Sequence, residues 1–229
     1  ILTAGNYKIE TGRNITVIET PYYDYGIHCD KKYVRYLSKK YKNYKYLLFY
    51  GSLNKVKGIK EIGDSIYNIL TKYPTIILVL CGELKNTDNF NYLNYIKDKA
   101  KNNSDRVVHF GPLEHKYLYP LISSAYAILL PSRNDNLPNA CIESMSLKQV
   151  IIGSEGASFE QLIKDNYNGI LCKARHSKSI EKAIDRLFSM NENEIRLMKE
   201  KAKERIKDLS PEIVVKQVEG YFQNIINKN

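Results

Sequence analysis

Residues 75–82 read Thr-Ile-Ile-Leu-Val-Leu-Cys-Gly, a run of six apolar side chains that a glycine ends. A strand without polar alternation is typical of a parallel sheet that helices cover on both faces. Upstream, residues 58–73 carry isoleucine and leucine at helical spacing, and residues 46–50, Tyr-Leu-Leu-Phe-Tyr, form a second apolar run that Gly51 ends. These three segments predict one strand–helix–strand unit.

The same alternation continues downstream of this unit. We expect further helices over residues 89–102, 114–124, 138–148 and 157–164, and further strands over residues 107–110, 126–130, 150–152 and 170–172. Six strands that alternate with helices predict an α/β fold with a Rossmann-like, doubly wound parallel sheet and right-handed crossovers. Because ligands of such sheets bind beyond the carboxyl ends of the strands, the loops that follow the strands are the candidate site.

The repeating pattern covers residues 46–190, which we predict to be one ligand-binding domain. Residues 1–45 contain one expected strand, at 15–18, and a polar, tyrosine-rich stretch that we interpret as a linker. Residues 191–229 continue as C-terminal helices. The chain begins with Ile rather than Met and has no signal-peptide pattern. We therefore expect a piece of a longer protein, whose preceding domain ends within residues 1–45.

The composition of the chain limits the classes of partner that we expect. A net charge of +10 permits contact with acidic ligands or an anionic membrane surface. The lysines are spread along predicted helices, which usually indicates solvated faces, so we expect no nucleic-acid partner. The four cysteines are far apart in the sequence and predict neither a zinc site nor a disulfide framework. With no apolar run of membrane-spanning length, a cytoplasmic protein is expected.

The loop from Gly51 to Gly58 joins the first strand to its helix. Its glycines and its ending differ from those of a Walker phosphate loop. It nevertheless places backbone N–H groups, Ser52 and Lys57 near a helix N-terminus, where a diphosphate is favoured. An ordinary strand-to-helix turn with surface lysines is the alternative, and the loop alone leaves it open.

Two carboxylates mark the segment that follows the fourth strand. Asp135 lies in the loop and Glu143 lies about a turn and a half into the next helix, so that both can face one cleft. A carboxylate is a good acceptor for vicinal hydroxyls such as a ribose diol. A helix cap at Asp135 or Asn136 and a solvated Glu143 are the alternatives. After the next strand, Glu160 follows a loop glycine and can reach the same cleft.

In this order and spacing, the motifs resemble those of the C-terminal domain of family 4 of the retaining glycosyltransferases. That domain reads G-R-L-x-x-x-K-G, G, V-x-F-x-G, P-S-x-x-E-x7-E-A, G-G-x-x-E and N-G. The matching residues are Gly51-Ser52-Leu53 with Lys57-Gly58, Gly82, Val107 with Gly111, Pro131-Ser132 with Asp135 and Glu143, Gly156 with Glu160, and Asn168-Gly169. The match spans about residues 46–190.

The resemblance implies the donor-binding half of a GT-B fold, which moves a sugar from a nucleoside diphosphate sugar to an acceptor hydroxyl with retention of configuration. The acceptor would be a saccharide or lipid-linked, at the inner face of a membrane. No metal or other cofactor is required, because Lys57 and helix dipoles can neutralise the diphosphate. By this resemblance, Lys57 would bind the donor diphosphate, Glu143 would hold the ribose hydroxyls, and Asp135 would act as the catalytic residue at the donor sugar. The backbone N–H groups of Asn136, Leu137 and Asn139 would contact sugar hydroxyls and phosphate, and the loop at Phe110 and Gly111 would lie against the base. Gly51, Ser52 and Glu160 are further candidate donor-binding residues.

Four departures from the family pattern bear on activity. Ser52 replaces an Arg, Asp135 is one methylene shorter than a Glu, Asn136 replaces a Gly, and His109 replaces a Phe. They allow a distinct donor as well as weak or lost catalysis. Two other functions stay open: a non-catalytic nucleotide- or sugar-binding module, and a sugar-nucleotide epimerase of related two-domain fold.

Overall fold

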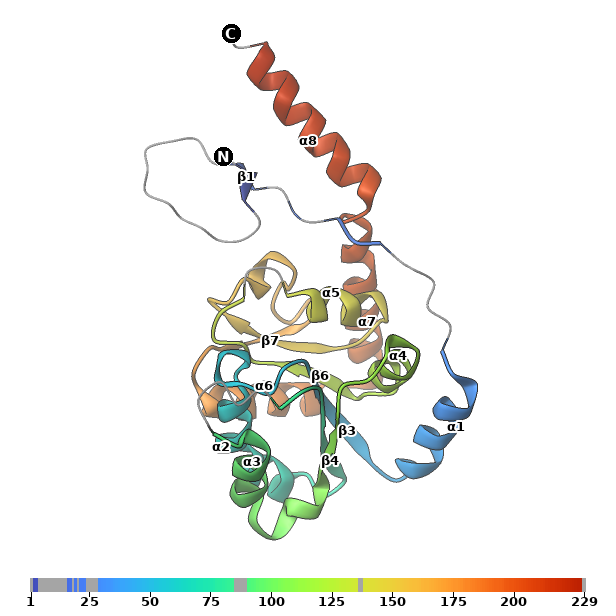
Figure 1. Cartoon of the computed structure of the whole chain (residues 1–229), viewed down its shortest axis with the longest axis vertical. Helices are drawn as coiled ribbons and strands as arrows, with labels where there is room; N and C mark the ends of the chain where they lie inside the picture. The colour runs from blue at the N-terminus through green and yellow to red at the C-terminus, as the bar shows by residue number, and fades with distance from the viewer. Residues whose placement is uncertain are drawn as a thin grey trace.

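A six-stranded parallel sheet forms the centre of the molecule. The computed structural model describes residues 2–3, 16–17, 19, 21–23, 29–84, 90–135 and 138–227. The six strands are β3 (Lys45–Tyr50), β4 (Ile76–Cys81), β5 (Val107–Phe110), β6 (Ala127–Leu130), β7 (Ile151–Glu155) and β8 (Ile170–Lys173). Their order in the sheet is β5-β4-β3-β6-β7-β8, and all neighbours run parallel (Figure 1). The predicted Rossmann-like, doubly wound sheet is therefore confirmed.

Helices cover both faces of this sheet. They are α1 (Lys31–Lys40), α2 (Ile59–Lys72), α3 (Tyr92–Ala100), α4 (His115–Ser123), α5 (Asn139–Ser146), α6 (Ser177–Ser189), α7 (Glu192–Lys207) and α8 (Pro211–Ile226), with the short 3-10 helices η1 (Lys55–Lys57), η2 (Lys101–Arg106) and η3 (Phe159–Gln161). Helices α2, α3 and α6 share one apolar core, and α1, α4 and α5 share the other. Alternate residues of β3 enter the two cores: Leu47 and Phe49 the first, Leu48 and Tyr50 the second.

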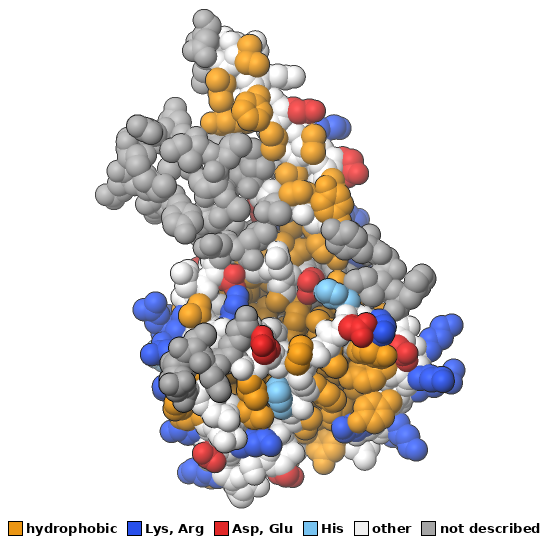
Figure 2. All heavy atoms as spheres, in the orientation of Figure 1, with side chains coloured by type: hydrophobic (Ala, Val, Ile, Leu, Met, Phe, Trp, Pro, Cys, Tyr) orange, Lys and Arg blue, Asp and Glu red, His pale blue; other side chains and the backbone are white. Residues whose placement is uncertain are grey.

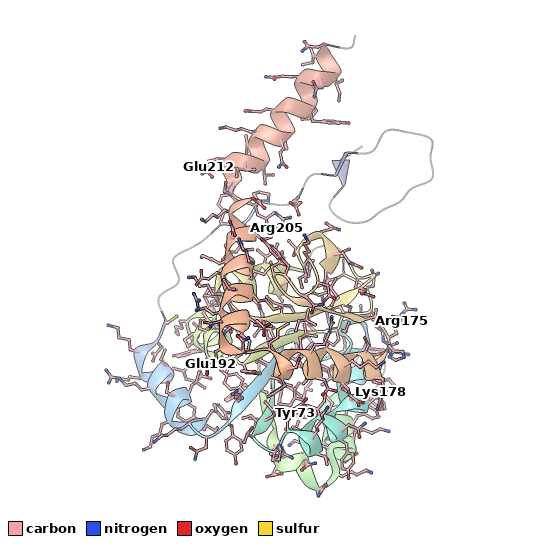
Figure 3. All side chains as sticks on the ribbon, turned by 180° about the vertical axis from the view of Figure 1, so that it is seen from behind. Tyr73, Arg175, Lys178, Glu192, Arg205 and Glu212 are labelled. Carbon is pink, nitrogen blue, oxygen red and sulfur yellow. The ribbon has the colours of Figure 1, made fainter. Side chains whose placement is uncertain are left out.

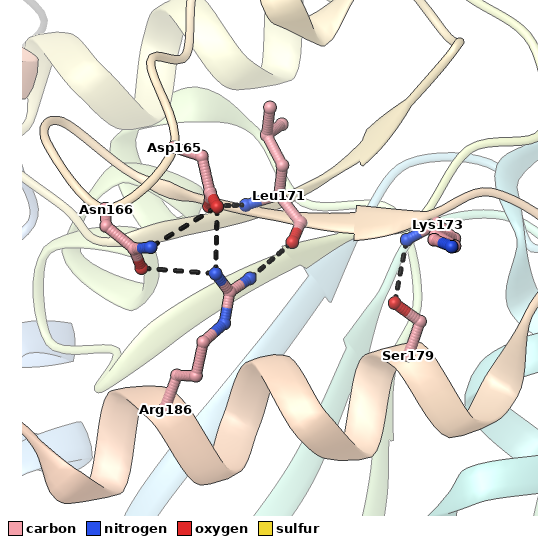
Figure 4. A network of polar contacts seen from close by, with 6 residues as sticks. All are labelled: Asp165, Asn166, Leu171, Lys173, Ser179 and Arg186. Carbon is pink, nitrogen blue, oxygen red and sulfur yellow. Dashed lines mark hydrogen bonds and ion pairs between the residues drawn. The ribbon is translucent and has the colours of Figure 1, made fainter.

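The back of the molecule shows how the last helices are attached. Helix α6 lies across the sheet, and the hydroxyl of Tyr73, beyond the end of α2, donates to Asp185 on α6 at 2.7 Å (Figure 3). Arg186 of α6 holds the turn before β8 through Asp165 at 2.8 Å and contacts β8 itself through the Leu171 carbonyl (Figure 4). Helix α7 then crosses the sheet, with one buried side chain in the first core and two in the second.

Helix α1 corrects the interpretation of the stretch before residue 45 as a linker. Asp30 caps this helix by accepting a hydrogen bond from the Tyr33 N–H at 2.7 Å. Leu37 and Tyr41 turn inward and are buried in the second core. The polar composition hid the helix, because only a narrow stripe of it meets the protein. The packed body consequently extends beyond residues 46–190 at both ends, since α7 also buries side chains in the cores.

Two other predicted helices are shorter than expected. Of the helix over 157–164, only the 3-10 turn η3 forms, because Phe159 fills the core and the chain must return to the start of β8. The helix over 89–102 ends at Ala100, where Lys101 adopts a φ of 55° that an α-helix cannot continue. Arg106, at the end of η2, donates to the carbonyls of Tyr73 and Ile76 at 3.2 and 3.1 Å and so holds the turn between α2 and β4.

The ends of the chain lie apart from this body. Strands β1 (Leu2–Thr3) and β2 (Thr16–Val17) pair in parallel, so part of the strand predicted over 15–18 is present, whereas residues 15 and 18 lie outside the described residues. Helix α8 projects away from the sheet and carries exposed apolar side chains (Figures 1 and 2). Within the described part of the chain, no helix has the length and apolar character needed to cross a membrane.

Candidate functional site

The order of strands reverses between β3 and β6, and their carboxyl ends bring two loops together. This switch point is where α/β sheets bind ligands. The two loops, residues 51–58 and 131–138, touch at Gly58, whose φ is 75°. A Cβ built on Gly58 would lie 1.8 Å from the carbonyl oxygen of Pro131. Only glycine therefore permits this approach of the two loops.

Lys57 and Asp135 meet across this contact. The Lys57 ammonium lies 2.7 Å from Oδ2 of Asp135, and the two side chains are 38% and 13% exposed. Asn54 fixes the backbone of Lys57 by accepting from its N–H at 3.0 Å. Ser132 donates from its hydroxyl to the same Asp135 oxygen at 3.4 Å. A cation and a carboxylate predicted from separate motifs are thus direct partners.

A buried ion pair supports the two loops from below. Arg133 lies two residues before Asp135, and its guanidinium contacts Glu61 in the first turn of α2 at 2.5 Å. The Glu61 side chain is 6% exposed. The backbone N–H of Arg133 also donates to the carbonyl of Val56 at 2.8 Å. These contacts tie the loop that carries Asp135 to the loop that carries Lys57.

A pocket of about 330 Å³ opens above this contact. Lys57, Asp135, Ser132, Gly51 and Asn139 are among the residues that line it. Helix α5 begins here at Asn139, and its N-cap residue, Pro138, has no side-chain acceptor for the N–H groups of the first turn. Free N–H groups at a helix N-terminus attract anions. The pocket therefore combines a lysine, a helix N-terminus and a glycine loop around one space.

Glu143 lies on the other side of Asn139, in a second pocket of about 480 Å³ that His115, Tyr119 and Tyr22 also line. The Tyr50 hydroxyl, at the end of β3, donates to the Ala140 carbonyl and approaches Oε2 of Glu143 at 3.4 Å. Asn139 lines both pockets, which therefore lie side by side along the first turns of α5, and we call the pair the groove.

Burial raises the pKa of the Glu143 carboxyl above its ordinary value, although the nearby His115 and the Tyr50 hydroxyl oppose the shift. The same burial, together with the Glu143 charge, raises the pKa of Tyr50 well above 10. A carboxylate that is partly withdrawn from water gains more from a hydrogen-bond donor than a solvated one. Glu143 is half-buried in the wall of a pocket, which is less exposed than the alternative interpretation of a solvated helix residue expects.

Other predicted residues lie elsewhere. Glu160 accepts a hydrogen bond from the Gly156 N–H and lines a third pocket beside α7. Phe110 and Gly111 are not among the residues that line the two pockets of the groove. Instead, the Phe110 ring packs against the second core, and the Gly111 carbonyl accepts from the Cys81 thiol at 3.5 Å. Asn136 and Leu137 lie outside the described residues.

Several groove residues were not identified from the sequence. Tyr50 ends β3 beside the glycine loop, and the rule that ligands bind at strand ends could have identified it. His115 and the Arg133–Glu61 pair carried no local motif, because each depends on segments that only packing brings together. His109, the departure from the family Phe, contacts the Gly82 carbonyl at 3.0 Å and so holds the turn after β4.

Cys81, Cys141 and Cys172 are buried free thiols, and Cys29 is an exposed one. Nowhere in the described ranges do three or more His, Cys, Asp or Glu side chains gather closely enough to hold a metal ion.

Comparison with known proteins places this groove in context. A family model described as glycosyl transferases group 1 matches residues 33–205. An uncharacterized glycosyltransferase of Methanocaldococcus jannaschii is 25% identical over 202 residues, which cover 86% of this chain and 49% of the relative. The alpha-D-kanosaminyltransferase of Streptomyces kanamyceticus is 26% identical over 89 residues, or 39% of this chain and 23% of that protein. The chain spans about half the length of the Methanocaldococcus relatives that it matches.

Solved structures share the fold. HepE of Anabaena in complex with UDP superposes with a TM-score of 0.81 at 12% identity, covering 97% of this chain and 63% of that one. Sucrose-phosphate synthase of Thermosynechococcus elongatus gives 0.77 at 16% identity, covering 100% and 58%. The C-terminal domain of a group 1 glycosyl transferase from Francisella tularensis gives 0.64 at 18% identity, covering 79% of this chain and 93% of that domain.

Proposed function

Because this chain belongs to the glycosyl transferases group 1 family, we propose that it is the donor-binding half of a retaining enzyme that takes a nucleoside diphosphate sugar as donor. The single observation that carries the proposal is the groove along α5, which presents Lys57 and a helix N-terminus at one end and Glu143 at the other. HepE of Anabaena, which shares the fold, has been solved with UDP and glucose.

The pocket beside Lys57 suits a diphosphate. The Lys57 ammonium can make a charge-assisted hydrogen bond to a phosphate oxygen. The N-terminus of α5 adds N–H donors and a favourable dipole. Without a ligand, the ammonium is neutralised by Asp135 at 2.7 Å. We therefore infer that a diphosphate shares or displaces this ion pair when it binds.

The pocket beside Glu143 suits the nucleoside. The two carboxylate oxygens of Glu143 can accept hydrogen bonds from both hydroxyls of a ribose. Tyr50 supports the first turns of α5 from the sheet side through the Ala140 carbonyl. The ring of His115, which stands against Tyr119 with centroids 5.3 Å apart, lines the same space.

In the proposed reaction, the bond from the anomeric carbon to the diphosphate oxygen breaks while a bond to an acceptor oxygen forms on the same face of the sugar. The leaving diphosphate keeps the bonding electrons and takes up the proton of the acceptor hydroxyl, and Lys57 with the α5 dipole stabilises its charge. Asp135 stabilises positive charge that develops on the sugar ring. The acceptor is a hydroxyl of a saccharide or of a lipid-linked molecule. We expect its binding site in the other half of the longer relatives. Such an enzyme would work in the cytoplasm, at the inner face of a membrane where the acceptor is lipid-linked.

Lys57→Ala should weaken the binding of a nucleoside diphosphate and leave the binding of the nucleoside unchanged. A charge-assisted contact is worth roughly 1.5–3 kcal/mol. Because Lys57 is 38% exposed, solvent screening favours the lower end, roughly tenfold in affinity. Calorimetry with UDP, GDP, uridine and guanosine measures both. Lys55→Ala is the matched control, since Lys55 is exposed in the same 3-10 turn and does not line the pocket. An equal loss for diphosphate and nucleoside would show that Lys57 acts through the fold.

Ser52→Arg should tighten diphosphate binding. Ser52 follows Gly51, which lines the diphosphate pocket, and an Arg at this position adds a planar cation that can pair with phosphate oxygens. The gain should disappear with nucleosides that lack phosphate and should shrink as salt is added. Unchanged affinity for UDP and GDP would place the Ser52 side chain away from the ligand.

The 229-residue chain alone should bind nucleotide but show no efficient sugar transfer. The proposed groove supplies contacts to the donor. The relatives of this chain are about twice as long, and we expect their additional half to bind the acceptor. Radiolabelled UDP-, GDP- and ADP-sugars, offered with a mixture of saccharide acceptors, test both halves of the expectation. Efficient transfer would show that a complete active site resides in this chain.

A further inference from the structure

One exposed segment is strongly basic. Residues 31–45 contain seven of the 35 basic residues of the chain and none of its 25 acidic ones. All seven are exposed: Lys31, Lys32, Arg35, Lys39, Lys40, Lys42 and Lys45. Most of the net charge of +10 is therefore concentrated on α1 and the turn after it. Elsewhere basic and acidic residues are nearly balanced.

The outward face of α1 is built differently from an ordinary solvated helix. Leu37 and Tyr41 anchor it to the second core, so the basic side chains point away from the body. Two amphipathic rings accompany them, because Tyr36 is 46% and Tyr44 45% exposed. Figure 2 shows Lys and Arg side chains gathered along the edge that α1 forms, at the lower right. We call these six basic residues from 31 to 42, with the two tyrosines, the α1 patch.

Two acidic residues at the starts of α1 and α4 have partners of their own. Asp30 caps the helix through the Tyr33 N–H, and Glu114 is paired with Lys116 at 3.0 Å. Lys40 donates to the Tyr36 hydroxyl at 2.7 Å, and this contact raises the pKa of Lys40. The carboxylates of Asp30 and Glu114 are therefore engaged outside the patch.

We propose that the α1 patch docks the protein onto an anionic lipid surface. Clustered Lys and Arg on an exposed helix are attracted to anionic headgroups, by roughly 5-fold in binding per residue near the surface. Tyrosine rings settle at the level of lipid headgroups, where one edge is apolar and the other wet. A helix fixed along its inward face presents both kinds of side chain to a flat surface without insertion.

Docking through this patch would place the groove beside the lipid. Helix α1 packs against α4, and the backbone N–H of Asp30 donates to the Lys116 carbonyl at 3.1 Å. His115 and Tyr119 of α4 line the pocket that holds Glu143. A lipid-linked acceptor could then reach the groove from the same surface. This last consequence rests on the proposed function, whereas attachment to the lipid does not.

Vesicle sedimentation of the 229-residue chain tests the proposal. Vesicles of phosphatidylcholine alone are compared with an about 7:3 mixture of phosphatidylcholine and phosphatidylglycerol. The test variant changes Lys31, Lys32, Arg35 and Lys39 to Gln, a residue of similar helix propensity. The control variant removes the same charge from exposed lysines elsewhere, by changing Lys97, Lys99, Lys101 and Lys182 to Gln.

We expect binding to the anionic vesicles only, weakened by roughly tenfold or more in the test variant and little changed in the control. Binding should fade between about 0.1 M and 1 M salt as the Debye length falls from about 10 to about 3 Å. Equal losses in both variants, or equal binding to both vesicles, would overturn the proposal. So would displacement from the vesicles by an oligonucleotide at equal phosphate concentration, which would assign the patch to nucleic acid. UDP binding is measured in parallel, because it tests the proposed function independently of attachment to the vesicles.

Discussion

Gly58→Ala should destabilise the protein by roughly 2–5 kcal/mol and abolish high-affinity nucleotide binding. The left-handed backbone costs a non-glycine residue roughly 1–2 kcal/mol, and a Cβ 1.8 Å from the Pro131 carbonyl adds the cost of overpacking, roughly 1–3 kcal/mol. The clash involves backbone on both sides, so the loops must separate, and Lys57 moves away from Asp135. Thermal unfolding should show the melting temperature lowered by roughly 5–15 °C.

Gly156→Ala is the matched control for this prediction. Gly156 has the same φ of 75°, but a Cβ there would meet no atom within 4 Å. It should therefore cost only the backbone strain, roughly 1–2 kcal/mol. Equal destabilisation by the two substitutions would mean that the contact between Gly58 and Pro131 contributes nothing, and that the two loops are held together by Arg133 and Glu61 instead.

Glu143→Ala should remove the ability of the protein to distinguish ribonucleotides from 2′-deoxyribonucleotides. If the carboxylate accepts from both ribose hydroxyls, the loss of one leaves a partly buried oxygen unpaired, at roughly 1.5–3 kcal/mol. The wild type should therefore bind UDP or GDP roughly 10- to 150-fold more tightly than the deoxy forms. Calorimetry with the four ligands on both proteins measures the effect. Wild-type binding that ignores the 2′-hydroxyl would reject the ribose contact.

The raised pKa of Glu143 adds a pH dependence with a defined sign. The folded state holds the Glu143 proton more tightly than the unfolded chain, so this carboxyl lowers stability as pH rises from its ordinary pKa of 4.5 through the raised value. Ribonucleotide affinity should rise over the same interval, because the ionised form is the acceptor. Glu143→Gln should abolish both trends and stabilise the protein near pH 7. Glu200→Ala, on the exposed side of α7, should change neither.

Several features of the protein follow from local patterns alone. The apolar run of residues 76–81 can be buried only between two helical layers, and the strand–helix alternation leaves the parallel doubly wound sheet as its solution. Only seven residues separate Asp135 from Glu143 along the chain, and the start of the helix between them limits where they can point. For this reason, strands, fold class and the carboxylates of the groove could be predicted from the sequence.

Other features depend on contacts between distant segments. Lys57 and Asp135 are 78 residues apart, yet they are ion-pair partners, because β3 and β6 are neighbours and Gly58 lets their loops touch. Helix α1 has the composition of a linker, but it is held in place because Leu37 packs into the second core. Hydrophobic periodicity reports which face of a segment is buried, but it does not report which distant residue will cover that face. Packing alone makes these pairings, and with them the groove and the exposed basic edge of α1.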